Sequence, residues 1–448
     1  MRALALFIVA IAATIGTYAA VRPVTLEEAE TLAIANSKQV AAARQGIKKA
    51  EAQVSEALGY ALPTLNLSAV YTRNVQLPVF FIPDFSDPAS GRLNAVTVGL
   101  DNQYNVGVQA SQILFNSAVF TGIGASRMYN AAARANLRGV IATVVTDTRK
   151  RFYGALLAKE FLAIAKATLG NGQSNLENIQ LLFREGLVAE FDAIRAEVAV
   201  DNIKPIVTQA ESGYDNAVSA LVTYMGVSMS DSLEPVGSFS TDLQDVGSED
   251  DNIRKALADN YDVKATDLQM QVSREFITVN EGDYYPTIAA FGNWMNQGQS
   301  ATFSNWLSAS SAGVGLQFQM NLFNGLRTKA KVEQSQADYE TVRVQVAQLK
   351  DGVRLQVRTF MNLIRSAKAR YEGLQRTVRQ AERGREIAQI RYREGTGSLL
   401  EINDADLALA QARTNTTQAL HDFHIARFDL ERAVGGLDAR YFTSIPRD

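Results

Sequence analysis

The sequence contains no cysteine among its 448 residues. This absence excludes disulfide bonds, thiolate metal sites, a cysteine nucleophile and a lipid-modified cysteine at a mature N-terminus. Histidine is almost as scarce, since only His421 and His424 are present. Two histidines three residues apart on a helix suit a metal ion, or they are ordinary packed or solvated side chains; we favour the second interpretation and expect no metal and no cofactor.

A strong excess of either charge is missing as well. The formal net charge is only −3, so the chain has neither the basic excess that nucleic-acid binding requires nor an acidic tail. Hydrophobic residues make up 47% and charged residues 20%, proportions typical of a folded protein. No nucleophile and base occur in a recognisable set, so we do not expect an enzyme.

Long apolar runs are scarce too. Residues 1–19 combine one arginine, a short apolar run and small residues at Thr17 and Ala19, a pattern typical of a cleaved secretory signal peptide. An uncleaved membrane anchor is the alternative, but the run is shorter than the ~20 residues that a helical span needs. No later stretch is long and apolar enough to form such a span. We therefore expect an exported protein.

The chain consists of two copies of one pattern. The segments FREGLVAEFD and YREGTGSLLEINDA place Gly186 and Gly395 at matching positions, 395 − 186 = 209 residues apart. Upstream, LFNS matches LFNG, and LPTLNL matches YPTIAA. Internal repetition on this scale indicates a duplicated architecture. It predicts a first repeat at 20–227, a linker at 228–248, a second repeat at 249–435 and a C-terminal tail at 436–448.

Each copy reads as a helical segment (25–60 and 249–284), two short strands, a very long helix, a glycine turn and a returning helix. In the second copy the long helix is predicted from Leu326 to Glu394, because apolar residues recur there every three or four positions. At 1.5 Å per residue this helix is about 100 Å long, which indicates a coiled-coil wall rather than a compact globule. The seam residues are Val342, Val346, Leu349, Val353, Val357, Phe360, Ile364, Ala367, Tyr371, Leu374, Val378 and Ala381.

The predicted strands, two per copy, alternate between apolar and polar residues, most clearly in 104–116 and 313–324. Alternation of this kind places the apolar side chains on one face of a sheet. A half-buried sheet in a soluble domain is the alternative for any single strand. Yet nothing else in the sequence covers these apolar faces, and open sheet edges are not tolerated in lipid. Several chains together are needed to close such a sheet.

With these features the sequence resembles the TolC family of outer membrane efflux and secretion channels. The resemblance rests on the duplication, the order of strand, LFN motif and long helix, and the two glycine tips. It implies a fold that is mainly α with a small β part: long α-helical coiled-coil hairpins plus four transmembrane β-strands per chain, in a trimeric α/β barrel. The linker 228–248 and the tail become an equatorial belt, and 75–103 and 298–312 become extracellular loops. The first loop contains the apolar segment PVFFIPDF, which packs either over the barrel mouth or against its own hairpin.

For function, the resemblance implies a passive trimeric outer membrane exit duct of a tripartite efflux pump or a type I secretion system. Its cargo would be small molecules or polypeptides moving from the periplasm to the outside. The implied partners are two further copies of the chain, a periplasmic adaptor (membrane fusion) protein, an inner-membrane transporter of the RND, ABC or MFS type, and outer membrane lipid, but no nucleic acid. The alternative is a periplasmic coiled-coil scaffold that is not inserted in the membrane.

The resemblance also implies a pore constriction, formed in three copies by the acidic residues Glu401 and Asp404. Rings of carboxylates select for cations. For Glu401 there is an alternative, because Ser398 and Glu401 have the spacing of a capping box at a helix start.

An inter-helix latch is implied at Tyr392 and Asp192. The arginine that shares this latch in the best-known member of the family falls on Gly397 here, which puts a strong latch in doubt unless Arg393 or Arg195 replaces it.

The two tips are the implied docking surface for the adaptor. That surface consists of Gly186, Leu187 and Val188 on the first tip and Gly395 and Thr396 on the second. The alternative is that both glycines only end helices, since glycine adopts the left-handed conformation without penalty.

Overall fold

The computed structural model describes residues 22–86, 91–228, 233–443 and 445. The predicted signal peptide at 1–19 lies outside these residues. The prediction of a mainly α fold with a small β part is confirmed. The helices are α1 (Leu26–Asn36), α2 (Lys38–Gly59), α3 (Ser117–Arg184), α4 (Glu190–Met225), α5 (Glu249–Asp259), α6 (Tyr261–Glu281), α7 (Arg327–Arg393) and α8 (Leu399–Ala433), with short 3-10 turns η2 (Gly282–Tyr284) and η3 (Ala439–Phe442). The strands are β1 (Arg22–Val24), β2 (Thr64–Arg73), β3 (Val79–Pro83), β4 (Leu93–Thr97), β5 (Asn102–Phe115), β6 (Leu233–Pro235), β7 (Thr287–Ser300) and β8 (Leu307–Gln319).

The long helix of the second copy is confirmed, because α7 ends within one residue of the predicted boundary on each side. None of the twelve predicted seam residues is exposed. Val353 and Val357 lie at the centre of this seam, in a core that also contains Phe423 of α8. No helix in the described part of the chain is long and apolar enough to cross a membrane.

The first helical segment of each copy is two helices rather than one. The break falls at Ser37 in the segment 25–60 and at Asn260 in the segment 249–284. The Ser37 hydroxyl accepts from the amide three residues ahead at 3.4 Å, and the Asn260 side-chain oxygen accepts from the amides two and three ahead at 3.0 Å. Such caps satisfy the free amides of a new helix start, so both copies restart their helix at the same place.

The duplication is visible in the way each returning helix ends. Gly226 ends α4 and Gly435 follows α8, and both have a φ of +68°. A Cβ atom built on Gly226 would lie 3.0 Å from Asn36, and one on Gly435 would lie 2.2 Å from the carbonyl oxygen of Asp259. Asn36 and Asp259 sit at equivalent breaks in the two copies. The same close backbone contact therefore occurs twice, and only glycine fits it.

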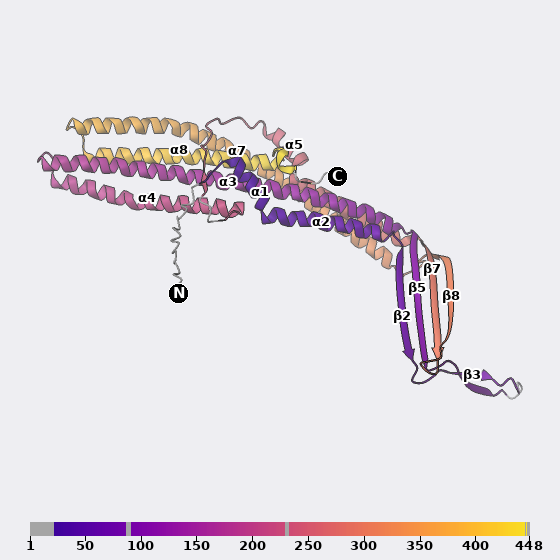
Figure 1. The fold of residues 1–448 in the computed structure, drawn as a ribbon. Coiled ribbons are helices and arrows are strands. Elements are labelled where there is room, and N and C mark those ends of the chain that lie inside the picture. The colour runs from indigo at the N-terminus through magenta and orange to yellow at the C-terminus, as the bar shows by residue number, and fades with distance from the viewer. Residues whose placement is uncertain (1–21, 87–90, 229–232, 444, 446–448) are drawn as a thin grey trace, which may run out of the picture. The chain divides into compact units, whose positions relative to one another are not determined.

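Two compact units make up the described chain, and each draws on both copies. The helical unit comprises the described parts of 1–45, 135–264 and 348–448, and it contains both glycine tips. The sheet unit comprises 46–134 and 265–347. Within the sheet unit the strands lie in the order β2-β5-β7-β8, so the inner pair β5–β7 joins the two copies (Figure 1).

The four-stranded sheet has one apolar and one polar face, as predicted. All neighbouring strands are antiparallel, and the register places Leu67 beside Val108, Val108 beside Trp294 and Trp294 beside Ala312. The side chains next in sequence point the other way and include Gln109 and Asn293. On the apolar face, Leu67 is 73% exposed in the single chain. The apolar face therefore lacks a cover within the described chain.

The predicted loops need correction. The segment 75–103 contains the antiparallel hairpin β3–β4, which was not predicted from the sequence. The segment 298–312 is mostly strand, since β7 continues to Ser300 and β8 begins at Leu307. Apart from Leu307, the strand residues within 298–312 are polar or small, so they lack the alternation on which the prediction relied. One further pair, β1 with β6, is parallel and was not predicted.

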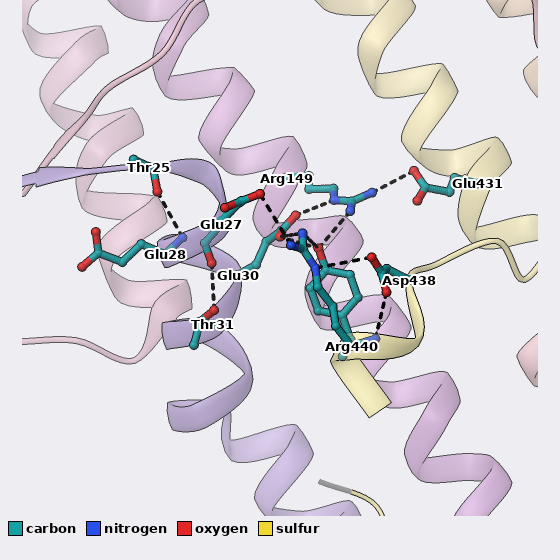
Figure 2. Close-up of polar contacts among 10 residues, drawn as sticks. Thr25, Glu27, Glu28, Glu30, Thr31, Arg149, Glu431, Asp438 and Arg440 are labelled. Carbon is teal, nitrogen blue, oxygen red and sulfur yellow. Dashed lines mark hydrogen bonds and ion pairs between the residues drawn. The ribbon is translucent and has the colours of Figure 1, made fainter. Parts of the chain in front are cut away.

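The C-terminal tail is anchored to the helical unit by a buried polar cluster (Figure 2). Arg149 of α3 donates to Glu30 of α1 at 2.6 Å and to Glu431 of α8 at 2.8 Å. The Tyr441 hydroxyl of the tail donates to the same Glu30 at 2.6 Å and accepts from Arg440 at 2.7 Å. Glu30 is almost fully buried, and a buried charge is tolerated only when it is paired in this way.

The linker lies against α8 through one of the two histidines. His424 is buried among aromatic rings that include Tyr153 and Phe239, and its Nε2 lies 2.9 Å from the carbonyl oxygen of Ser240. Burial lowers the pKa of the His424 imidazole. His424 is thus a packed side chain, and no metal-binding cluster of acidic residues and histidines occurs in the described part of the chain.

Candidate functional site

Both tips have the same backbone structure. At the first tip the amide of Gly186 donates to the carbonyl three residues back at 2.9 Å, and the amide of Leu187 donates to the carbonyl five back at 2.9 Å. Gly395 and Thr396 make the same two bonds at the second tip, at 3.1 and 2.9 Å. Both glycines have positive φ, +73° and +70°. Each long helix therefore ends in a Schellman motif, and the predicted capping role of the two glycines is confirmed.

The outer surface of each tip is open. A Cβ atom at Gly186 or Gly395 would meet nothing within 4 Å. Leu187 is 70% exposed and Thr396 is exposed, whereas Val188 is half-buried against the apolar residues that hold the tip together. The five predicted docking residues thus leave an accessible patch with little side-chain bulk.

The two returning helices start differently. Ser398 caps α8, because its hydroxyl accepts from the amide of Glu401 at 3.3 Å. Ala189 stands at the start of α4 and makes no side-chain cap. The Glu401 carboxylate does not complete the capping box; it pairs instead with Arg391 at 3.0 Å. Half of the predicted capping box is therefore present, and Glu401 is already partly neutralised within its own hairpin.

Asp404 lies one turn after Glu401 on α8. Its side chain is exposed, and among the described residues it has no hydrogen bond or ion pair. No partner within the described chain therefore offsets the Asp404 carboxylate.

One further acidic residue at this tip was not predicted from the sequence. Asp406 accepts from Arg385 of α7 at 2.5 Å, and the two side chains are only 11% and 26% exposed. A signal for this pair exists in the sequence, because Asp406 and Arg385 lie about equally far on either side of the glycine turn. In an antiparallel hairpin, such positions meet across the two helices.

The structure brings the two predicted latch residues close together but does not bond them. Tyr392 packs against the apolar cluster of the first tip, and its hydroxyl is buried without a hydrogen-bond partner. Burial and the negative charge of nearby Asp192 raise the pKa of the Tyr392 hydroxyl. Within the described chain the two side chains are therefore linked by charge alone, without a hydrogen bond.

Within the described chain, neither Arg393 nor Arg195 bonds to Tyr392 or Asp192. Arg393 donates to a carbonyl of its own helix at 3.4 Å, and Arg195 is half-buried on α4 without a bond to Tyr392. A Cβ atom at Gly397 would lie 3.0 Å from the backbone nitrogen of Tyr392. A side chain at this position therefore requires the turn to shift, which explains why glycine stands there.

A groove of about 580 Å³ lies between α3, α4 and α8. Its walls are mainly apolar, with Phe161, Ile203 and Leu407 among them. Asn175 and Asp406 add polar groups, and the Asn175 amide nitrogen is buried without a partner. The groove shows that α8 of the second hairpin lies along both helices of the first.

Comparison with known proteins agrees with this architecture. A family model described as outer membrane efflux protein matches residues 31–227 and 252–436. The chain is 23% identical over 387 residues to the outer membrane protein TolC of Vibrio cholerae, which covers 84% of this chain and 82% of that protein. It is 23% identical over 321 residues to the alkaline protease secretion protein AprF of Pseudomonas aeruginosa, covering 67% and 66% of the two chains.

Solved structures have the same fold. Crystal structures of CusC match with a TM-score of 0.77 at 17% identity, over 92% of both chains. The Campylobacter jejuni CmeC outer membrane channel matches with a TM-score of 0.74 at 16% identity, over 92% of this chain and 85% of that one. At these identities the likeness concerns the fold alone.

Proposed function

The chain belongs to the outer membrane efflux protein family, and on that premise we propose that it works as a passive homotrimeric duct whose two tips dock a periplasmic adaptor. The protein is an outer membrane exit duct for efflux or secretion. Its family consists of channels, and we assign it no enzymatic activity.

The observation that carries the proposal is the amphipathic sheet with two free edges. Within the described chain, β2 and β8 each pair on one side only. Because neighbouring strands alternate in direction, β2 and β8 run in opposite directions, so β8 of one copy can pair antiparallel with β2 of the next. Closing the edges in this way satisfies the backbone groups that lipid cannot solvate. The exposed apolar face then contacts lipid. In a soluble scaffold the same face would be left in water.

A passive duct supplies no energy for transport, so a partner protein must supply it. We assign that role to an inner-membrane transporter of the RND, ABC or MFS type, joined to the duct by an adaptor. Relatives named for efflux and for protease secretion match at the same identity of 23%. Both small molecules and polypeptides therefore belong to the proposed cargo.

For the constriction, we assign the larger role to Asp404 and a smaller one to Glu401. Three copies of an exposed, unpaired carboxylate around one axis form a ring that attracts cations. Glu401 contributes less because Arg391 already offsets its charge. Tyr392 and Asp192 are assigned to a weak latch at the same level of the hairpins.

The test is a bulky charge at each tip glycine. Gly186→Glu and Gly395→Glu are expected to abolish export while the trimer still assembles in the outer membrane. The backbone strain of a side chain with positive φ costs only about 1 kcal/mol per site. Loss of export would therefore reflect lost docking, and compensating changes in the adaptor should restore it.

Two control variants separate docking from folding. Gly395→Ala imposes the same backbone strain without bulk or charge, and it should retain export. Gly384→Glu adds the same side chain on the exposed surface of α7, where a Cβ atom also meets nothing within 4 Å. Export that survives both tip substitutions at normal protein levels would assign the tips to structure alone and move the docking surface elsewhere.

A further inference from the structure

The hairpin β3–β4 is apolar on both of its faces. Its register pairs Phe80 with Val96 and Ile82 with Asn94, so Phe80, Ile82 and Val96 share one face. Phe81 and Leu93 lie on the opposite face and are 67% and 61% exposed. A two-stranded hairpin is at best marginally stable alone in water. Exposed aromatic and aliphatic side chains on both faces therefore indicate that each face is covered in the assembled protein.

The base of this hairpin lies on the polar side of the four-stranded sheet. Leu77 precedes β3 and Gly99 follows β4. A Cβ atom on Gly99 would lie 3.4 Å from the amide nitrogen of Gln103 and 3.9 Å from both the amide oxygen of Gln299 and a methyl of Leu77. By register, Gln103 and Gln299 belong to the polar face of the sheet. The hairpin thus leaves the sheet on the side away from its apolar surface.

An aromatic cluster marks the other face at the same end of the sheet. The ring of Tyr71 lies 5.7 Å from that of Phe303, and the ring of Tyr104 lies 5.1 Å from that of Trp306. Tyr71 and Tyr104 share the face of Leu67 and Val108. Tyrosine and tryptophan gather where a membrane meets water, so this cluster marks the outer limit of the lipid-facing band. The hairpin lies beyond that limit, at the end of the sheet where Figure 1 labels β3.

We infer that the three β3–β4 hairpins of the assembled duct pack against one another over its outer mouth and narrow it. The occupant of each apolar face is thus a second copy of this chain, and the inference rests on the proposed trimeric function. In a three-membered ring every copy has two neighbours, one on each side. A hairpin with two different apolar faces suits such a ring, because the Phe80 face of one copy meets the Phe81 face of the next.

The composition of the hairpin favours this occupant over a lipid surface. Its strands VFFIP and LNAVT contain no charged residue. Binding to anionic headgroups requires clusters of lysine and arginine, which these strands lack. If the hairpin inserted into lipid, it would lie on the side of the sheet that carries the aromatic cluster. Its base lies instead on the polar side of the sheet.

The chain has no cysteine, so the ring can be tested by disulfide cross-linking of the full-length protein. Leu93 and Val96 face opposite sides of β4 and are about 10 Å apart along the strand, too far to bond within one chain. In Leu93→Cys/Val96→Cys, a mild oxidant should produce covalent dimers and trimers in a denaturing gel without reductant. Each single-cysteine variant is the matched control. A head-to-tail contact brings position 93 of one copy to position 96 of the next, so a variant with only one of the two cysteines should form much less covalent dimer.

The oligomeric state is measured separately, by the mass of the protein in mild detergent. A trimer without covalent dimers or trimers would overturn the hairpin ring and leave the duct proposal standing. A monomer would overturn the duct proposal, and the ring with it.

The functional readout is single-channel conductance. Phe80→Ser/Phe81→Ser/Phe85→Ser should raise the conductance of the reconstituted trimer, while Phe303→Ser, an exposed aromatic residue at the same end but outside the hairpin, should not. Unchanged conductance in the triple variant would overturn the inference that the hairpins narrow the outer mouth. A dye on Phe81→Cys that is quenched by doxyl-labelled lipid would place the hairpin in the membrane and overturn the ring.

Discussion

The two helical hairpins share one backbone plan but differ in what holds their helices together. One ion pair links α3 to α4 in the described part of the chain, between the half-exposed Lys166 and Glu211 at 2.9 Å. Four ion pairs link α7 to α8, with distances of 2.5 to 3.0 Å. These four are Arg370–Asp422, Arg385–Asp406, Arg391–Glu401 and Glu382–Arg413.

The helix starts also favour the second hairpin over the first. Ser398 caps α8, whereas Ala189 leaves α4 without a side-chain cap. Pro205 lies inside α4, where it removes one backbone hydrogen bond. The duplication has thus kept the glycine turn, which no other residue fits without strain, while the side chains around it have diverged. We expect local opening of the first hairpin to require less free energy than opening of the second.

The largest expected effect comes from breaking the buried pair of the second hairpin. Asp406→Ala leaves the mostly buried guanidinium of Arg385 without its partner, which costs about 2 kcal/mol. Hydrogen exchange of the amides in 386–405 should accelerate by roughly thirtyfold, since each 1.4 kcal/mol is a factor of about ten. The measurement uses the intact trimer in detergent.

The matched control in the first hairpin is Glu211→Ala. Its ion pair with Lys166 is half exposed, and surface pairs contribute about 0–1 kcal/mol. Exchange at the first tip should therefore change little. Equal acceleration in both variants would mean that ion pairs do not distinguish the two hairpins.

The second prediction concerns the charge that each tip presents. Asp404 of the second copy corresponds to Arg195 of the first, at the same spacing of 404 − 195 = 209 residues. Asp404→Asn removes an unpaired carboxylate from the proposed ring, and block of single-channel current by multivalent cations should weaken about tenfold or more. Glu401→Gln should weaken block less, because Arg391 already offsets that charge.

A stronger effect from Glu401→Gln than from Asp404→Asn would reverse this assignment. Unchanged block in the double variant Glu401→Ala/Asp404→Ala, together with faster exchange at the tip in Glu401→Ala alone, would assign Glu401 to the structure of the helix start.

Sequence patterns predicted the features that depend on local chemistry. The apolar spacing located α7 to within one residue at each end, and the glycines located both turns. The alternation of 104–116 and 313–324 identified two strands of the sheet, since pleating fixes which side chains share a face. The second prediction ran too far, because β8 ends at Gln319. Each of these features is set by residues close together in the chain.

What the sequence did not reveal depends on contacts between distant residues. The pairing of Asp406 with Arg385 requires the register of one helix on another, and the strength of a latch at Tyr392 requires the position of Asp192 on a different hairpin. The hairpin β3–β4 was missed because its apolar residues do not alternate. Its apolar run lies on both faces, so it lacks the period that marks a strand with one buried side.

The smallest expected effect comes from exchanging the caps of the two returning helices. Ser398→Ala removes the hydroxyl that accepts from the Glu401 amide, and loss of such a cap costs about 1 kcal/mol. Ala189→Ser places a hydroxyl at the uncapped start of α4 and should stabilise the first tip by up to the same amount, because its backbone already has the extended conformation of a cap residue, with φ −74° and ψ 151°. Hydrogen exchange at the first turn of each helix measures both changes, and they should be opposite in sign. Ala189→Ser could leave exchange of the first tip unchanged while Ser398→Ala accelerates exchange of the second. The weakness of the first hairpin would then lie in Pro205 and in its smaller number of ion pairs rather than in its helix start.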